Sequence, residues 1–223
     1  MRHETDILTT SAGDLEITFL GHGSLLFTFD EKTIYVDPYS GVADYAHLPK
    51  ADLVLITHEH RDHLDQKALA DITTSETEII LTEICNEQID GGTIMRNGDV
   101  HITHGLTIEA VPAYNLVHTR DSGEPFHPCG NGNGYIIAFA DLRVYVAGDS
   151  ENTPEMMNLR GIDVAFLPMN LPYTMTPQMV AEAARAMKPR ILYPYHYGQT
   201  DTGELAKLLA DQPDTEIRIR QLA

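Results

Sequence analysis

The sequence contains no tryptophan and only two cysteines, Cys85 and Cys129. Two cysteines that are not spaced as C-x-x-C are too few for a disulfide framework, so we expect both to be ordinary thiols. No apolar run is long enough to cross a bilayer, and residues 1–15 lack the basic and apolar regions of a secretion signal. These absences predict a cytoplasmic protein.

Basic residues are also scarce. Lysine and arginine number 15 against 33 aspartates and glutamates, which gives a net charge of −18 with neutral histidine. A surface of this charge repels phosphate backbones and anionic lipids, so we expect no nucleic acid and no membrane as partner. A small-molecule substrate is the remaining expectation.

Apolar residues make up 43% of the 223 residues, which is enough to bury a full core. Sandwich folds of this length form without splitting, so residues 1–223 are predicted to be a single domain. Alternating patterns at residues 15–29 and 33–36 predict an antiparallel meander, and helices are predicted at 66–72, 176–188 and 204–210. Strands precede helices in each half, an order that fits two mixed sheets with helices outside.

The most informative segment is residues 57–65, with the sequence THEHRDHLD. A buried-strand pattern at residues 52–57 precedes it and a short helical pattern follows it. The histidines and aspartates between them therefore lie on a turn that a strand and a helix both hold in place.

Imidazole and carboxylate groups are common ligands of Zn²⁺-like ions. Because alternate side chains of an extended backbone point the same way, His58 and His60 can converge on one ion. Asp62 and His63 are adjacent and diverge from that pair unless the chain turns. A second ion beside the first is the simplest use of both pairs.

Other candidate residues lie at predicted strand ends and in one long loop. Asp149 and His196 each follow an apolar strand, and His22 lies between two glycines that interrupt another. Residues 112–134 form an irregular segment rich in proline, glycine and asparagine. Loops of this length inside a compact domain are usually functional or disordered.

The H-x-H-x-D-H pattern of residues 58–63 resembles the signature of the metallo-β-lactamase fold superfamily. Further matching segments extend from about residue 15 to 200: Leu-Gly-His, Asp-Pro, Gly-Asp-Ser-Glu, Met-Thr-Pro and Pro-Tyr-His-Tyr-Gly. Together they are most similar to the metal-dependent hydrolases related to ascorbate-6-phosphate lactonase and the phospholipase-D-like phosphodiesterases. The resemblance implies an α/β fold, an αββα sandwich of two mixed β-sheets with helices on the outer faces.

The resemblance also implies a ligand set. His58 and His60 begin the first set, Asp62 and His63 begin the second, Asp149 bridges the two ions, and His196 completes the second set. Asp37 would support the metal loop without binding metal. His22 and Tyr173 are candidates for substrate contact.

The third ligand of the first set departs from the family pattern, because Asn115 stands where a histidine is usual. Asn115, His118 and His127 are the three alternatives. We favour His127, because prolines on both sides stiffen its backbone and because the branch with Pro-Ala-Tyr-Asn has a similar Phe-His-Pro segment.

These residues predict a hydrolase that uses a metal-bound hydroxide on an ester, a lactone or a phosphodiester. Two divalent ions are expected, Zn²⁺ first, with Mn²⁺, Fe or Ni²⁺ as alternatives. Asp62 would act as the catalytic residue that orients the nucleophile or takes its proton. Bound cations would offset the negative charge locally, so the substrate can be anionic, and a homo-oligomer is compatible with the sequence. The competing interpretations are a di-iron redox enzyme on the same fold and a non-catalytic metal-binding module.

Overall fold

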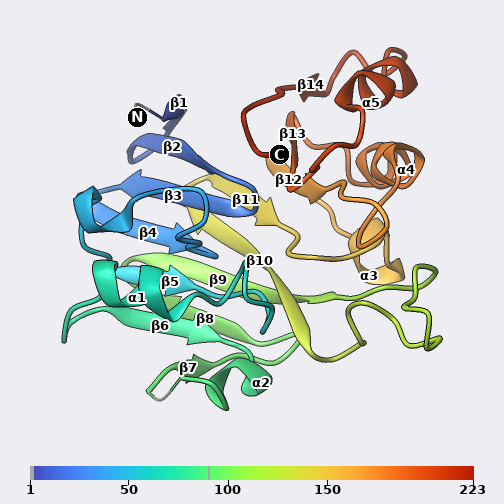
Figure 1. Cartoon of the computed structure of the whole chain (residues 1–223). Helices are drawn as coiled ribbons and strands as arrows, with labels where there is room; N and C mark the ends of the chain where they lie inside the picture. The colour runs from blue at the N-terminus through green and yellow to red at the C-terminus, as the bar shows by residue number, and fades with distance from the viewer. Residues whose placement is uncertain (1–2, 90) are drawn as a thin grey trace.

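The structure, a computed structural model, describes residues 3–89 and 91–223. Two sheets of seven strands each lie face to face (Figure 1). The strands of the first sheet are adjacent in sequence order: β1 (Glu4–Thr10), β2 (Gly13–Gly21), β3 (Ser24–Phe29), β4 (Lys32–Val36), β5 (Leu53–Leu55), β6 (Glu78–Leu81) and β7 (Thr93–Ile94). So are those of the second: β8 (Val100–Thr103), β9 (Leu106–Ala113), β10 (Gly132–Phe139), β11 (Leu142–Val146), β12 (Val164–Pro168), β13 (Ile191–Tyr195) and β14 (Glu216–Ile217).

Both sheets follow the same plan. Strands β1 to β4 pair antiparallel, and β5, β6 and β7 continue that sheet in parallel. Strands β8 to β11 are again antiparallel, and β12, β13 and β14 are added in parallel. The carboxyl ends of neighbouring parallel strands lie at the same edge of a sheet, so the loops that follow β4, β5, β11 and β13 can meet there.

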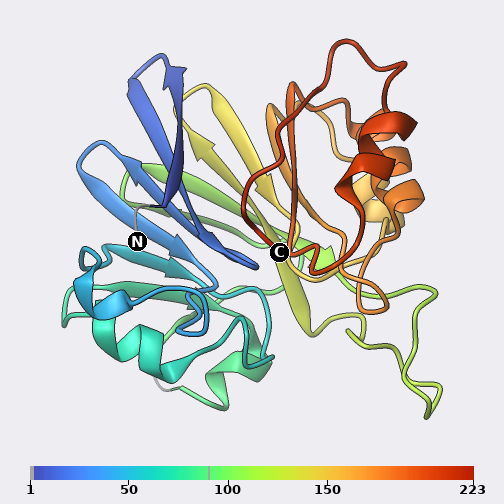
Figure 2. The ribbon, with the colours of Figure 1, turned by 45° about the horizontal axis from the view of Figure 1, so that its top comes forward.

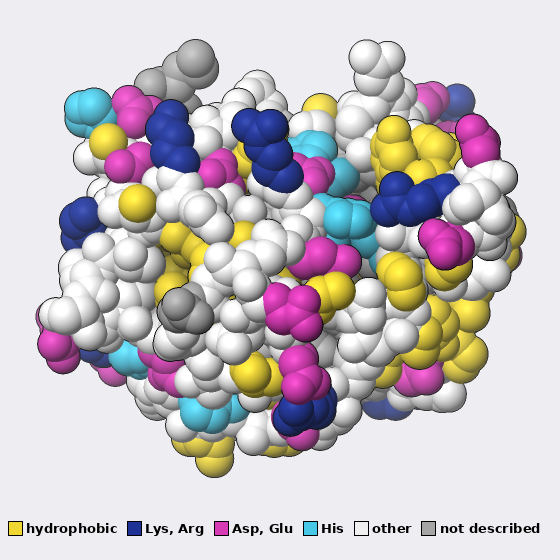
Figure 3. Space-filling model, turned by 60° about the horizontal axis from the view of Figure 1, so that its bottom comes forward, with side chains coloured by type: hydrophobic (Ala, Val, Ile, Leu, Met, Phe, Trp, Pro, Cys, Tyr) yellow, Lys and Arg dark blue, Asp and Glu magenta, His cyan; other side chains and the backbone are white. Residues whose placement is uncertain are grey.

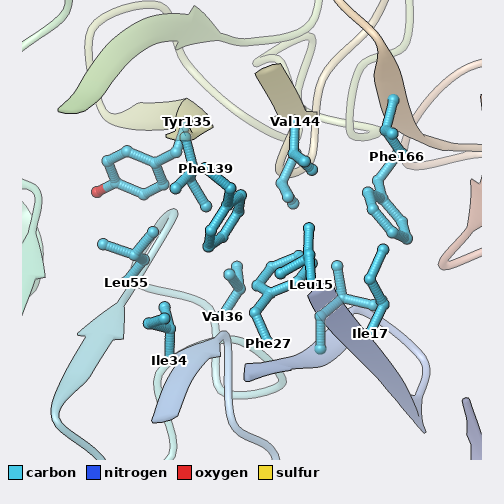
Figure 4. Packing of buried hydrophobic residues seen from close by; sticks show 14 of the residues in the cluster. Leu15, Ile17, Phe27, Ile34, Val36, Leu55, Tyr135, Phe139, Val144 and Phe166 are labelled. Carbon is cyan, nitrogen blue, oxygen red and sulfur yellow. The ribbon is translucent and has the colours of Figure 1, made fainter. Parts of the chain in front are cut away.

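The main core lies between the two sheets. Leu15, Ile17 and Phe27 of the first sheet point toward Phe139 and Phe166 of the second (Figure 4). Alternation along each strand sends the intervening residues to the outer face, where Leu26 and Val54 belong to a separate cluster. The strands are therefore buried on both faces, which explains their nearly continuous apolar sequences.

Helices cover the outer faces. The 3₁₀ turn η1 (Tyr45–His47), α1 (Gln66–Ile72) and α2 (Glu83–Asn86) pack on the first sheet. On the second sheet pack α3 (Pro154–Met157), α4 (Pro177–Met187) and α5 (Thr202–Leu208). The two groups lie on opposite outer sides of the molecule (Figure 2). This arrangement confirms the predicted αββα sandwich.

Helix α4 begins where the sequence predicts. The hydroxyl of Thr176 accepts a hydrogen bond from the backbone N–H of Met179, and Pro177 occupies the first turn. The helix ends at Lys188, whose left-handed backbone has a φ of 54°. In the described ranges, no helix is long and apolar enough to cross a membrane.

Several elements differ from the sequence-based expectation. Strand β1 is not predicted, because its sequence ETDILTT is mostly polar, and Leu8 is its one buried residue. Helix α5 lies at 202–208 rather than 204–210, since the Asp201 carboxylate caps it by accepting from the Gly203 N–H. The last strand is short and covers only Glu216–Ile217.

Candidate metal centre

Four loops bring the candidate ligands together. The loop after β5 carries His58, His60, Asp62 and His63, and His127 comes from the long segment between β9 and β10. Asp149 and His196 follow β11 and β13, the two strand ends that the sequence indicates. Figure 3 shows histidine side chains close to acidic ones on one face of the molecule.

His58, His60 and His127 form the first group. One ring nitrogen of each lies within 4.8 Å of the others, and His58 Nε2 is 3.2 Å from His60 Nδ1. Three imidazoles that converge in this way match the donor set of a Zn²⁺-like ion. The histidine from the long loop thus meets the pair on the turn after β5.

The second group surrounds Asp62. Its Oδ2 lies 3.0 Å from His22 Nε2, 3.5 Å from His196 Nε2 and 3.7 Å from His63 Nε2. His63 Nε2 and His196 Nε2 are 3.2 Å apart, and their rings are stacked. Two ring nitrogens this close to each other and to a carboxylate need a proton or a cation between them.

Asp149 lies between the two groups. Its Oδ2 is 3.3 Å from His127 Nε2 and 4.0 Å from His58 Nε2. Its Oδ1 is 3.6 Å from both His63 Nε2 and His196 Nε2, and this buried oxygen has no hydrogen-bond partner among the described residues. One carboxylate therefore presents one oxygen to each group, and a buried unpartnered oxygen is what a bound cation would satisfy.

Hydrogen bonds to the opposite ring nitrogen fix the tautomers of two histidines. His63 Nδ1 donates to Asp37 Oδ2 at 2.7 Å, and His127 Nδ1 donates to Asn115 Oδ1 at 2.7 Å. The Nε2 atom of each ring then faces the cluster and is the nitrogen that would bind a metal ion after losing its proton. These residues fit divalent metal ions.

Asp37 also holds the turn after β5. Besides the His63 ring, its carboxylate accepts hydrogen bonds from the backbone N–H of Thr57 at 2.8 Å and from the Thr57 hydroxyl at 2.6 Å. Asp37 is fully buried on the loop after β4. It therefore connects the ends of two parallel strands beneath the candidate ligands.

Buried charge dominates the electrostatics. Burial alone would raise the pKa of Asp149, but three nearby histidines outweigh it and hold the pKa of this carboxyl well below its usual range. Burial would lower the pKa of His63, but Asp149, Asp37 and Asp62 raise it to about 9. The carboxylates thus create a negative potential at His63. The same potential would attract a metal cation to this position.

A cavity of about 450 Å³ opens onto these groups. Its described lining contains candidate ligands from both sets, together with four other side chains: Arg120, Phe126, Asn170 and Tyr173. Tyr173 therefore lies where substrate contact was predicted. His22 does not line the cavity; it packs against the His196 ring, with 3.8 Å between ring centroids, and contacts Asp62. This placement favours His22 as a partner of Asp62 over a contact to substrate.

The structure separates the three alternatives for the third ligand of the first set. His127 joins His58 and His60, whereas His118 belongs to no such group of histidines and carboxylates among the described residues. Asn115 instead accepts hydrogen bonds from the backbone N–H of His127 and from its ring. His118 lies against Glu151, 2.6 Å from its Oε1.

Comparison with known proteins identifies the family. The model of the Beta-lactamase superfamily domain matches residues 16–196. The chain belongs to this superfamily. A UPF0173 metal-dependent hydrolase of Thermococcus onnurineus is 31% identical over 220 residues, which cover 91% of this chain and 96% of the relative.

Solved structures of the superfamily agree. A crystal structure of a metal-dependent hydrolase from Parabacteroides distasonis is 49% identical, covers 99% of this chain and 100% of that chain, and has a TM-score of 0.94. Igni18, a metallo hydrolase of Ignicoccus hospitalis, has a TM-score of 0.76 at 23% identity, covers 94% of this chain and 96% of its own, and supports the fold alone.

The superfamily member described here is a metal-dependent hydrolase with the predicted fold. Its metal, its substrate, the roles of the individual ligands, its cytoplasmic location and its oligomeric state remain predictions.

Several residues of the site could not be assigned to it from the sequence. Arg120 and Phe126 line the cavity from an irregular loop, and Asn170 reaches it from the segment after β12. Phe126 and Glu151 belong to the Phe-His-Pro and Gly-Asp-Ser-Glu segments, but these patterns assign no role to either residue. Their positions at the site depend on contacts between distant segments.

Proposed function

We propose that this hydrolase cleaves an ester, lactone or phosphodiester bond of a small molecule at a centre of two divalent metal ions. His58, His60 and His127 would hold one ion; Asp62, His63 and His196 would hold the other. The observation that carries the proposal is the position of Asp149, whose two oxygens face the two histidine groups separately. The predominance of imidazole donors favours Zn²⁺, with Mn²⁺, Fe and Ni²⁺ as alternatives.

Divalent ions at this centre would polarise the bond to be cleaved and lower the pKa of a water molecule toward about 7. The protein's own contribution begins with Asp62, which lines the cavity. Burial would raise its pKa, but hydrogen bonds from His196 and His22 lower it far below its usual range. The ionised carboxylate can therefore accept a hydrogen bond from the attacking water and orient it. His22 positions Asp62 through its contact with Oδ2.

The cavity limits the substrate. A volume of about 450 Å³ suits a small molecule. Two aromatic side chains in contact with each other, Phe126 and Tyr173, line the cavity together with the candidate ligands. A substrate can thus place its reacting bond at the cluster and an apolar part against the aromatic rings.

The test uses His58→Ala and Asp149→Ala. Metal content is measured by mass spectrometry, and turnover is measured with bis(4-nitrophenyl) phosphate, 4-nitrophenyl acetate and an aliphatic lactone. We expect about two ions per wild-type chain, reduced metal content in both variants, and loss of turnover by at least about a hundredfold, because ligands and bridging groups act as a unit.

His47→Ala is the matched control, since His47 is an exposed histidine that pairs with Asp44. It should keep full metal content and turnover. Full metal loading together with unchanged turnover in both site variants would refute the proposal.

A further inference from the structure

Arg120 is the cationic side chain of the cavity wall. Among the described residues that line the cavity, it is the sole lysine or arginine. It lies on the long loop between β9 and β10 and lines the same cavity as Asp62 and Asp149. A positive group at this position distinguishes one side of the cavity from the rest of a strongly acidic chain.

Local contacts hold the Arg120 side chain in place. Its guanidinium carbon lies 5.3 Å from the centroid of the Phe126 ring, and Nη2 donates to the Phe126 carbonyl at 3.2 Å. The Phe126 ring is braced edge-on by Tyr173, with 5.0 Å between centroids. The backbone N–H of Arg120 donates to Glu124 O at 2.7 Å, so the loop turns tightly at this point.

The Arg120 guanidinium has hydrogen-bond donors that no described residue accepts from. It offers five N–H groups, and the structure records a hydrogen bond from only one nitrogen, Nη2. No ion pair joins Arg120 to a carboxylate of the described residues, although Arg96, Arg143 and Arg218 each have one. The chain has 33 acidic residues. An arginine that lies at a cavity and pairs with no carboxylate of the described residues is available to bind an anionic ligand.

We infer that Arg120 binds an anionic group of the substrate, a carboxylate or a phosphate, separate from the bond that is cleaved. Phe126 and Tyr173 contact the apolar part that joins this group to the reacting bond. The planar fork of arginine donates two parallel hydrogen bonds to either anion. This inference rests on the proposed function, since it takes the metal centre as the place of reaction.

The experiment measures binding, so it does not depend on turnover. Phenylphosphonate and its 2-, 3- and 4-carboxy derivatives are titrated by calorimetry into zinc-loaded protein. We expect at least one carboxy isomer to bind the wild type about tenfold more tightly than phenylphosphonate. Arg120→Gln should abolish this gain and change the affinity for phenylphosphonate by less than about threefold. In a parallel series, a second phosphonate replaces the carboxylate of each compound. Comparing the affinities of the two series distinguishes a phosphate from a carboxylate as the preferred anion.

Arg96→Gln is the matched control, because Arg96 is an exposed arginine that pairs with Glu83 and does not line the cavity. Arg96→Gln should retain the full gain in affinity that the carboxy isomer shows over phenylphosphonate. If no compound with a second anion gains affinity, or if the gain persists in Arg120→Gln, the inference is wrong. If the wild type cleaves the chromogenic esters but no compound with a second anion gains affinity, this inference alone is contradicted. If such a compound gains affinity but the protein cleaves none of the chromogenic esters, the proposed function alone is contradicted.

Discussion

Asn115 stands at the end of β9, where the family resemblance implies a histidine ligand. Its Oδ1 accepts hydrogen bonds from the backbone N–H of His127 at 2.8 Å and from the ring Nδ1 at 2.7 Å. Its Nδ2 donates to Glu151 and to the Tyr173 carbonyl. An amide that both accepts and donates can connect three segments, so Asn115 orients a histidine that arrives from a different loop.

Replacing Asn115 by alanine removes the acceptor of the His127 ring. We expect the affinity of the first metal set to fall about 10- to 100-fold, the usual cost of losing a hydrogen bond that orients a metal ligand. Competition with a chromogenic chelator measures the affinity.

Tyr114→Phe is the control for Asn115→Ala, since the Tyr114 hydroxyl donates to Glu155 at an exposed site. It should leave metal binding unchanged. Equal chelator curves for Asn115→Ala and the wild type would show that Asn115 does not position His127.

At the scale of elements, one buried carboxylate organises the start of the long loop. Glu151 is fully buried. It accepts hydrogen bonds from three successive backbone N–H groups, of Leu116 at 2.6 Å, Val117 at 2.7 Å and His118 at 2.8 Å. Leu116 and Val117 have mostly exposed side chains, so apolar burial does not hold them. The loop depends on Glu151 for its conformation.

Glu151→Gln should therefore destabilise the protein by about 2–4 kcal/mol, because a side-chain amide offers one acceptor oxygen where the carboxylate had two. Urea unfolding measures the loss, and hydrogen exchange at the amides of residues 116–118 should accelerate. Glu155→Gln, at an exposed site, should change stability by less than about 0.5 kcal/mol. Unchanged exchange at the three amides in Glu151→Gln would contradict this account.

The sequence predicts those elements whose signals are local. The turn at 57–65, the strand ends at Asp149 and His196 and the start of α4 follow from apolar runs and capping residues. Glu151 could not be assigned its role, because its partners Leu116–His118 lie more than 30 positions away and carry no pattern of their own. The contact of His22 with Asp62 could not be predicted either, since the sequence does not specify the backbone φ of 54° at His22; its contact with substrate stays a prediction.

At the scale of the molecule, the two sheets repeat one plan of antiparallel strands followed by parallel ones. The loops after β4 and β5 in one sheet meet the loops after β11 and β13 in the other. Asp37 and the histidine-rich turn come from the first half of the chain, and Asp149 and His196 come from the second. The centre thus requires both halves, and its geometry depends on how the two sheets are held together.

A hydrogen-bond network around Asp6 connects the two sheets at a place away from the candidate metal centre. Asp6 lies on β1, the outer strand of the first sheet, and its carboxylate accepts hydrogen bonds from Arg218 at 3.2 Å, from Arg220 at 2.8 Å and from the Tyr193 hydroxyl. Tyr193 belongs to β13 of the second sheet, and both arginines follow β14. The Arg220 guanidinium also lies over the Phe19 ring, at 5.6 Å.

Asp6→Asn should lower the free energy of unfolding by about 1–3 kcal/mol at pH 7, since it removes the charge that three donors share.

Burial would raise the pKa of Asp6, but Tyr193, Arg220 and Arg218 lower it below its ordinary value. A lowered pKa in the folded state stabilises the protein above the unfolded pKa of about 3.9, and this contribution is lost as the pH falls through the folded value. The difference between wild type and Asp6→Asn, measured by urea unfolding, should therefore be largest near neutral pH and shrink below about pH 4. Asp14→Asn, at the exposed start of β2, should show no such pH dependence. A difference that stays constant down to pH 3 would mean that β1 is held by packing and not by the charge of Asp6.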